Sequence, residues 1–311
     1  MNETTILWSS GAFTLTAWSL ILALSAACAV ALTAVLGRKR IGLDASLSGC
    51  IAAILGAVIG GRAVYCLTMI EFILYDLGGA GFMPQIWQGG FTLWGAVLGG
   101  AAGAAIYAKA TRRDLCALLN LMAPGAALVI SAARFAEFFT SQGLGDYISN
   151  EAMMRFPFAV ESFYGDWQMP VFLYEGLAAA IILIVALVIL LKGGRSWEVF
   201  AVLLALSQII LESWREDEFI RFGFVRFNQL MAAIVLAGVL ALRMVREVKA
   251  HGWRRWHTVR IILYALGIGV VIAIEFALDK STIDNGLLYC VMAATLAMMG
   301  IALLRGPKAA D

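Results

Sequence analysis

The sequence predicts an all-α, polytopic integral membrane protein built as a helical bundle. Of its 311 residues, 62% are hydrophobic and only 14% are charged, whereas a soluble domain is about 45–50% apolar and about 25% charged. One globular core cannot bury this excess, because single cores stop growing at about 250–300 residues. The net charge of +2 indicates no polyanionic partner, so nucleic acid is not an expected ligand.

Nine apolar runs are each long enough to be one transmembrane helix. A span needs about 20 mostly apolar residues, and a helix satisfies its own backbone hydrogen bonds in lipid. The expected spans are residues 12–36, 46–68, 93–110, 116–136, 171–191, 197–213, 228–245, 258–278 and 286–304. The first run is expected to stay in the protein, because the ten residues before it lack the basic segment of a signal peptide.

The basic residues predict how these helices are oriented. With the N-terminus outside, 16 of the 23 Lys and Arg residues fall in segments on the inner side. These are Arg38, Lys39, Arg40, Lys109, Arg112, Arg113, Lys192, Arg195, Arg243, Arg246, Lys249, Arg254, Arg255, Arg260, Arg305 and Lys308. The positive-inside rule therefore predicts an outer N-terminus and a cytoplasmic C-terminus.

Two long segments lie on the predicted outer side. Residues 69–92 are rich in glycine and contain no Lys or Arg, and residues 137–170 combine acidic and aromatic side chains. A connection of that length is uncommon unless it is functional or flexible. We expect residues 137–170 to form a folded cap at the level of the lipid headgroups. The inner connections are short and basic, so the chemistry is expected on the outer face.

Several kinds of site are not expected. The five cysteines are irregularly spaced and fit small apolar positions, and the carboxylates show no metal-ligand spacing. The two histidines, His251 and His257, fall on the predicted inner side. Neither a metal nor a cofactor is therefore expected, and Ser–His or Cys–His catalysis at the outer face is excluded.

Three arginines stand at the outer ends of predicted spans. Arg62 follows Gly60 and Gly61, Arg134 ends the fourth span, and Arg215 follows the sixth. Each could be a ligand-binding group or have a purely local role. The local role would be a side chain that snorkels to the headgroups for Arg62 and an ion pair with Glu137, three residues on, for Arg134. For Arg215 it would be membership of a solvated charge cluster. Charged residues in spans are costly and are usually paired or functional, and guanidinium groups grip phosphate oxygens in a bidentate manner. Together, the three arginines predict a receptor for a lipid phosphate.

Four stretches in order resemble the prolipoprotein diacylglyceryl transferase family. Residues 60–65 resemble its Gly-Gly-Arg-x-x-Tyr, residues 87–95 its Trp-Glu-Gly-Gly-Met-Ser-x-His-Gly, and residues 134–145 its signature Arg-x-Gly-Asn-Phe-x-Asn-x-Glu-x-x-Gly. Residues 170–175 resemble its Pro-x-Gln-Leu-Tyr-Glu. Shorter likenesses follow at residues 212–217 and 228–230, so the resemblance covers about residues 10–245.

The resemblance implies an enzyme of the bacterial plasma (inner) membrane. Family members transfer diacylglyceryl from phosphatidylglycerol to the lipobox cysteine thiol of a preprolipoprotein, forming a thioether and releasing glycerol phosphate. Carried over by motif, the catalytic residues are Arg134, Arg215 and Glu137, and the substrate-binding residues are Arg62, Tyr65, Trp94, Gln142, Gly145, Tyr174 and Glu175. The family region is expected at residues 1–245, with residues 246–311 adding a basic cytoplasmic loop and two further helices.

The sequence departs from the family pattern at three site positions. Trp94 replaces the family histidine, Glu137 its signature asparagine, and Gln142 its signature glutamate. A tryptophan cannot accept a proton, so Glu137 is either a rival of phosphate for Arg134 or the missing base. Two alternatives therefore stay open: a repurposed member of the same fold that binds a phospholipid or acts on another lipid or acceptor without this activity, and a transporter.

Overall fold

The computed structural model describes residues 4–11, 13–77, 79–216, 221–222, 225–280 and 283–304. Contacts divide the chain into two compact units, Met1–Trp197 and Glu198–Asp311. Within the described ranges, seven helices are long and apolar enough to cross a membrane. The predicted class, an all-α multi-pass membrane protein, is therefore confirmed.

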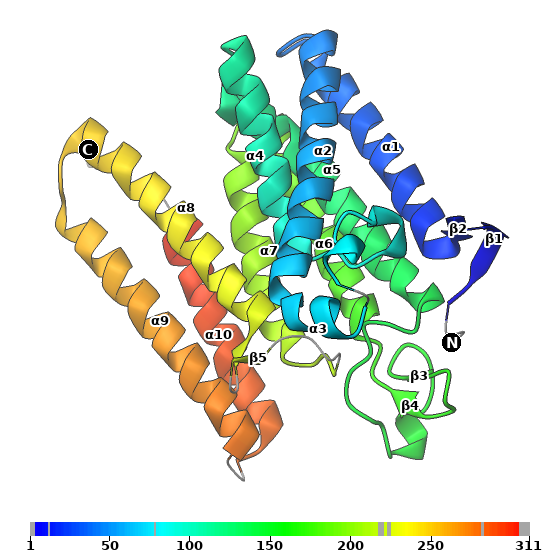
Figure 1. Ribbon diagram of the computed structural model, residues 1–311. Coiled ribbons are helices and arrows are strands. Elements are labelled where there is room, and N and C mark those ends of the chain that lie inside the picture. The colour runs from blue at the N-terminus through cyan, green and yellow to red at the C-terminus, as the bar shows by residue number, and fades with distance from the viewer. Residues whose placement is uncertain are drawn as a thin grey trace. The chain divides into compact units, whose positions relative to one another are not determined.

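The first unit is built on long helices that run side by side (Figure 1). In its described part these are α1 (Ala17–Gly37), α2 (Leu43–Thr68), α4 (Leu93–Thr111), α5 (Leu115–Ala136) and α6 (Val171–Leu191). The shorter elements are strands β1 (Ile6–Ser10) and β2 (Phe13–Thr16), helix α3 (Ile70–Tyr75), the 3-10 turns η1 (Ala80–Phe82), η2 (Ile86–Gln88), η3 (Glu137–Phe139) and η4 (Glu151–Met153), and strands β3 (Val160–Glu161) and β4 (Trp167–Gln168).

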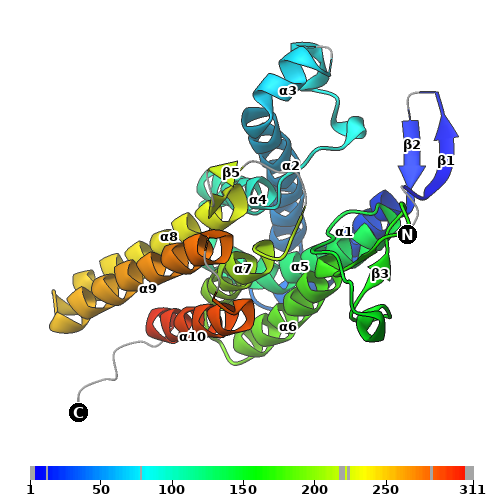
Figure 2. The same cartoon turned by 90° about the horizontal axis from the view of Figure 1, so that it is seen from below.

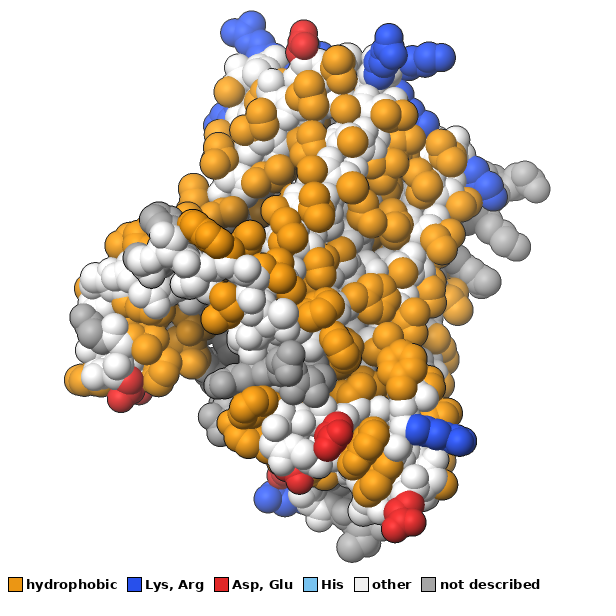
Figure 3. All heavy atoms as spheres, turned by 90° about the vertical axis from the view of Figure 1, so that its right-hand side faces the viewer, with side chains coloured by type: hydrophobic (Ala, Val, Ile, Leu, Met, Phe, Trp, Pro, Cys, Tyr) orange, Lys and Arg blue, Asp and Glu red, His pale blue; other side chains and the backbone are white. Residues whose placement is uncertain are grey.

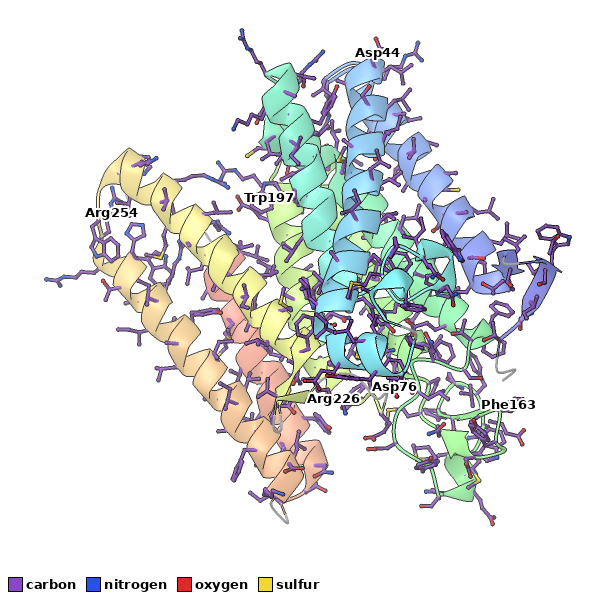
Figure 4. The ribbon with its side chains drawn as sticks, in the orientation of Figure 1. Asp44, Asp76, Phe163, Trp197, Arg226 and Arg254 are labelled. Carbon is purple, nitrogen blue, oxygen red and sulfur yellow. The ribbon has the colours of Figure 1, made fainter. Side chains whose placement is uncertain are left out.

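The short elements of this unit gather at one end of its helices. Figure 2 views the molecule from that end and shows the β1–β2 hairpin, α3 and the β3 region around the ends of the helices. Asp76 and Phe163 lie at this end and Asp44 at the opposite end (Figure 4). Residues 137–170, the segment for which a cap is expected and which we call the cap, contain two 3-10 turns and a two-stranded antiparallel sheet.

Local signals explain where the helices begin. Thr16 and Ser19 form a reciprocal capping box at the start of α1, which satisfies backbone donors that the first turn leaves free. The Asp114 carboxylate accepts from the Cys116 N–H (2.8 Å) at the start of α5. The predicted first span began at residue 12, but residues 13–16 pair with β1 instead, so α1 begins at Ala17.

Helices α2 and α4 meet along a seam of glycines. A Cβ placed on Gly60 would lie 2.5 Å from the carbonyl oxygen of Gly95 and 2.7 Å from the Cα of Gly99. No side chain fits at that separation, so the two backbones touch directly. Small residues allow this close approach between membrane helices. In lipid, helices associate through van der Waals packing because the hydrophobic effect does not drive them together.

The surface of the molecule is arranged as a membrane protein requires. Figure 3 shows hydrophobic side chains over the middle of one face and most Lys and Arg side chains at one end. The connections that carry Arg38, Lys39 and Arg40, and Arg112 and Arg113, are exposed. Exposed apolar side chains on these helices face lipid rather than water.

The second unit contains the remaining long helices. They are α7 (Ser196–Glu212), α8 (Phe227–His251), α9 (Arg255–Lys280) and α10 (Asn285–Leu304), with the short strands β5 (Arg221–Phe222) and β6 (Val225–Arg226) before α8. Helix α8 runs on to His251, so most of the basic loop expected after residue 245 is helical. Figure 4 places Arg226 and Arg254 at opposite ends of α8.

Each of the nine predicted runs coincides with one long helix in the described ranges, although seven of these helices meet the length and apolarity of a span. The two others are α7, which has only 17 residues, and α4, which has 19 residues diluted by glycine and Lys109. Arg305 and Lys308, used in the topology prediction, lie outside the described residues, as does the side chain of Arg221.

We expect Gly99→Val to destabilise the first unit, because a branched side chain must separate α2 from α4. The cost should be about 1–3 kcal/mol, as for other overpacked contacts, and should appear as a lower midpoint of thermal unfolding in detergent. Gly238→Val is the matched control, since nothing lies within 4 Å of a Cβ at this helical position. Equal midpoints for the two variants would show that the seam does not limit stability.

Candidate functional site

Arg134 lies in the last turn of α5 and is held by two carboxylates. Its Nη1 donates to Oε1 of Glu137 at 2.5 Å, and its Nε lies 3.4 Å from Oε2 of Glu175. The Arg134 side chain is 12% exposed and that of Glu175 is 0% exposed. The predicted i,i+3 pair is therefore present, and a second acid from α6 joins it.

The contact between α5 and α6 brings Glu175 to this position. Ser131 donates its hydroxyl to the carbonyl of Gly176 at 2.9 Å, and a Cβ on Gly176 would lie 2.6 Å from the ring of Phe135. Only glycine allows this approach, so α6 presents Glu175 to Arg134 at close range. From α1, the Trp18 indole donates to the carbonyl of Ala133 at 3.2 Å, which fixes the turn just before Arg134.

The loop after η3 closes over Glu137. Gly143 has a φ of +72°, a conformation that favours glycine, and a Cβ there would collide with Oε2 of Glu137. The loop is tied to the start of α6 by Phe172 N–H donating to Gly143 O at 2.8 Å and Gly145 N–H donating to Met169 O at 2.8 Å. Gly145 is thus a buried backbone position, whereas the Gln142 side chain is exposed.

Tyr174 belongs to the same region but points to the cap. Its hydroxyl donates to the carbonyl of Pro157 at 3.3 Å. Arg134, Glu137, Gly145, Tyr174 and Glu175 are therefore brought together at one end of α5 and α6.

Arg62 has a different environment from the other two arginines. It is 4% exposed, and its guanidinium donates to the carbonyls of Phe82 (2.8 Å), Met83 (3.0 Å), Gly89 and Gly90 (3.2 Å). Its Cζ also lies 4.7 Å from the centroid of the Phe82 ring and 5.5 Å from that of Tyr65. These contacts make Arg62 the organiser of the glycine-rich loop between α3 and α4, so a role in phosphate binding would require it to give up carbonyl partners.

Trp94 begins α4 and is completely buried. Its indole Nε1 has no hydrogen-bond partner among the residues that the structure describes. An indole nitrogen is a donor only, so this position cannot remove a proton. The backbone at Gly90 lies close to Arg62 and Tyr65, since a Cβ there would lie 2.8 Å from Arg62 Nη1 and 2.5 Å from the Tyr65 ring.

Arg215 lies in the second unit, in the turn that follows α7. It is 8% exposed, and its backbone N–H donates to the backbone carbonyl of Glu212 at 3.2 Å. The Glu212 carboxylate accepts from Nδ2 of Asn228 at 3.0 Å. Of the charged residues around Arg215 that the structure describes, Glu212 is buried with Arg215 and Glu216 is exposed.

Sequence reasoning missed one residue near this turn. Glu275 of α9 is buried, and its Oε1 accepts hydrogen bonds from Ser213 and from Gln229 (2.7 Å). The signal was present, because Glu275 is a carboxylate inside the apolar run 258–278, and such residues are costly unless paired or functional. Among the described residues, no group of three or more His, Cys, Asp and Glu side chains could hold a metal ion.

Comparison with known proteins identifies the family of this chain. A family model described as prolipoprotein diacylglyceryl transferase matches residues 5–246, which include every site residue named above except Glu275. The chain belongs to the prolipoprotein diacylglyceryl transferase family. The match ends within α8, so α9 and α10 lie outside it.

Individual relatives are similar at low identity. The chain is 26% identical over 252 residues to phosphatidylglycerol–prolipoprotein diacylglyceryl transferase 1 of Clostridium perfringens, over 77% of this chain and 94% of that protein. It is 30% identical over 245 residues to a protein of Frankia alni with the corresponding name, over 76% of this chain and 65% of that protein. A similarly named protein of Symbiobacterium thermophilum is 29% identical over 219 residues, covering 67% and 81% of the two chains.

We expect Arg62→Lys to loosen the loop at residues 76–92. A lysine ammonium is a single point of donation and cannot replace a fork that reaches four carbonyls. Chymotrypsin added to the purified protein should cut this loop faster than in the parent chain. Arg155→Lys, at an exposed position of the cap, is the matched control and should leave the cutting rate unchanged; an unchanged rate for Arg62→Lys as well would contradict the assigned role.

Proposed function

We propose that this chain is a phosphatidylglycerol–prolipoprotein diacylglyceryl transferase. It transfers diacylglyceryl from phosphatidylglycerol to the lipobox cysteine thiol of a preprolipoprotein, with glycerol phosphate as the second product. The observation that carries the proposal is Arg134, which occupies the first position of the family signature and lies between two carboxylates at one end of the helices. The family match over residues 5–246 and the names of the relatives support it.

Arg134 and Arg215 supply the positive charge that this reaction needs. When the C–O bond between glyceryl carbon and phosphate breaks, negative charge develops on the departing phosphate. Fixed guanidinium groups stabilise this charge, and they do so strongly where water is excluded. Arg134 is already oriented by Glu137 and Glu175, so it needs little reorganisation in the transition state.

Glu137 is the proposed base. The nucleophile must be a thiolate, and Trp94 cannot accept the thiol proton. The Glu137 carboxylate lies beside Arg134, near the end of α5, with its second oxygen against Gly143. In the step as proposed, the thiol proton passes to Glu137, sulfur forms a bond to the glyceryl carbon, and the phosphate leaves with the C–O electron pair. The proposed substrate site is lined or supported by six further residues: Tyr65, Trp94, Gln142, Gly145, Tyr174 and Glu175.

The proposed setting is the bacterial inner membrane, crossed nine times, with an outer N-terminus and a cytoplasmic C-terminus. The site and the cap then face the outer side, where a lipobox peptide and outer-leaflet lipid are available. The exposed Arg38–Arg40 and Arg112–Arg113 connections at the opposite end of the first unit support this orientation.

The orientation predicts which thiols an impermeant maleimide reaches in right-side-out membrane vesicles. The exposed Cys116, at the start of α5, should be protected until the vesicles are opened. A cysteine introduced by Asn150→Cys in the cap should be labelled from outside at once. The reverse pattern would invert the proposed topology.

The activity is tested by complementing a strain depleted of its own transferase and following lipoprotein modification. We expect rescue by the parent chain, and loss of at least about a hundredfold in activity for Arg134→Ala and Glu137→Gln, since removing a transition-state donor or base typically costs about that factor. Glu151→Gln, an exposed acid of the cap, should keep full activity.

Failure of well-expressed parent chain to rescue would contradict the proposed transfer. The substitutions at Trp94 and Glu137 would then favour the alternative, a member of the same fold that binds a phospholipid without transferring it. Retained activity in Glu137→Gln alone would remove the base role while leaving the function intact.

A further inference from the structure

Helix α9 places a carboxylate inside the second unit. Glu275 is 9% exposed and lies near the end of a 26-residue apolar helix. Removing a charge from water is expensive unless hydrogen bonds replace the lost hydration. Helix α9 could have carried an apolar residue here, so the partners of Glu275 indicate what the acid does.

Those partners belong to the ends of α7 and α8. Glu275 Oε1 accepts from the hydroxyl of Ser213 and from Nε2 of Gln229 at 2.7 Å. Gln229 is 5% exposed, and its Nε2 also donates to the carbonyl of Ile209 at 3.1 Å. The Gln229 Oε1 in turn accepts from the N–H of Arg226 at 3.1 Å, so Glu275 fixes which way this amide faces.

The same network continues to the turn that carries Arg215. Ser213 lies two residues before Arg215, and Asn228, next to Gln229, donates to Glu212 at 3.0 Å. Glu212 is thus bonded to α8, and Ser213 to both α8 and α9. The backbone N–H of Arg215 donates to the carbonyl of Glu212. The backbone position of Arg215 therefore depends on the hydrogen bonds that hold Glu212 and Ser213.

Helix α10 contacts the same turn through Tyr289, the fifth residue of that helix. The rings of Trp214 and Tyr289 meet edge to face, with centroids 5.6 Å apart and an interplanar angle of 82°. Edge-to-face packing is a favoured geometry for aromatic pairs. The two helices outside the family match therefore each contact one of the residues just before Arg215: α9 contacts Ser213 and α10 contacts Trp214.

We propose that α9 and α10 form a clamp that positions Arg215, with Glu275 as a positioning residue that acts through Ser213 and Gln229. The proposal rests on the proposed function, in which Arg215 stabilises the departing phosphate. It assigns the two appended helices a part in the reaction rather than in membrane anchoring alone. A displaced guanidinium would bind lipid almost as before but would stabilise the transition state less well.

The first test separates positioning from stability. Glu275→Leu, which removes both acceptor bonds, should lower kcat on the order of tenfold with little change in KM, as expected when an interaction of the transition state is weakened. Glu275→Gln should restore most of kcat, because its amide oxygen can still accept from Ser213 and Gln229. Leu266→Ala, an exposed position of α9, is the control and should keep the parent kcat.

The second test asks whether Glu275 acts through Arg215. In an Arg215→Lys background, Glu275→Leu should produce less than a twofold further loss, because the group it positions is gone. A full tenfold loss in that background would overturn the proposal, as would a Glu275→Leu variant that unfolds at a lower temperature but keeps the parent kcat.

A binding measurement keeps this test distinct from the proposed function. Phosphatidylglycerol in detergent micelles should raise the thermal midpoint of the purified full chain, and Glu275→Leu should keep most of that shift, because ground-state lipid binding is little changed. A parent chain that shows the lipid-dependent shift without transfer would refute the transferase activity. A parent chain that transfers diacylglyceryl, with a Glu275→Leu variant that keeps the parent kcat, would overturn only the role of Glu275. Absence of any shift and any transfer in the parent chain would overturn both proposals.

Discussion

Every charge inside this helical bundle needs a partner, and the pairing of Arg134 with two carboxylates is the arrangement on which the rest depends. Glu137 comes from the residue that follows α5, and Glu175 from the first turns of α6. Bringing them together requires a glycine at position 176 and a left-handed glycine at position 143. The local backbone conformation thus allows Arg134 to be paired, since an unpaired ion in this setting would cost several kcal/mol.

The same requirement explains the different fates of the other charged groups. Arg62 satisfies its donors with loop carbonyls and becomes structural, while Glu275 takes its hydrogen bonds from side chains beside Arg215. The indole of Trp94 can only donate a hydrogen bond, so in this proposal a carboxylate accepts the thiol proton instead. The family chemistry is therefore retained in this proposal with a different distribution of roles among its side chains.

The helices could be predicted from the sequence because a 20-residue apolar run has one satisfactory backbone in lipid. Each of the nine runs coincides with a long helix, and the signature arginine and its acid do pair as i,i+3 spacing suggested. Residues 13–16 were misassigned to the first span, because their apolar side chains continue that run while their backbone pairs with β1. The carbonyl partners of Arg62 could not be predicted, since they depend on a loop shaped by left-handed glycines at positions 79, 89 and 90.

The glycine seam between α2 and α4 also limits where a substrate can enter. Gly60, Gly95 and Gly99 bring the two backbones into direct contact, which leaves no width for an acyl chain between these helices. A lipid that moves laterally out of the bilayer must therefore pass along another pair of helices. The contact between α2 and α4 therefore blocks one lateral route for the hydrocarbon tails and restricts their path to the other sides of the helices.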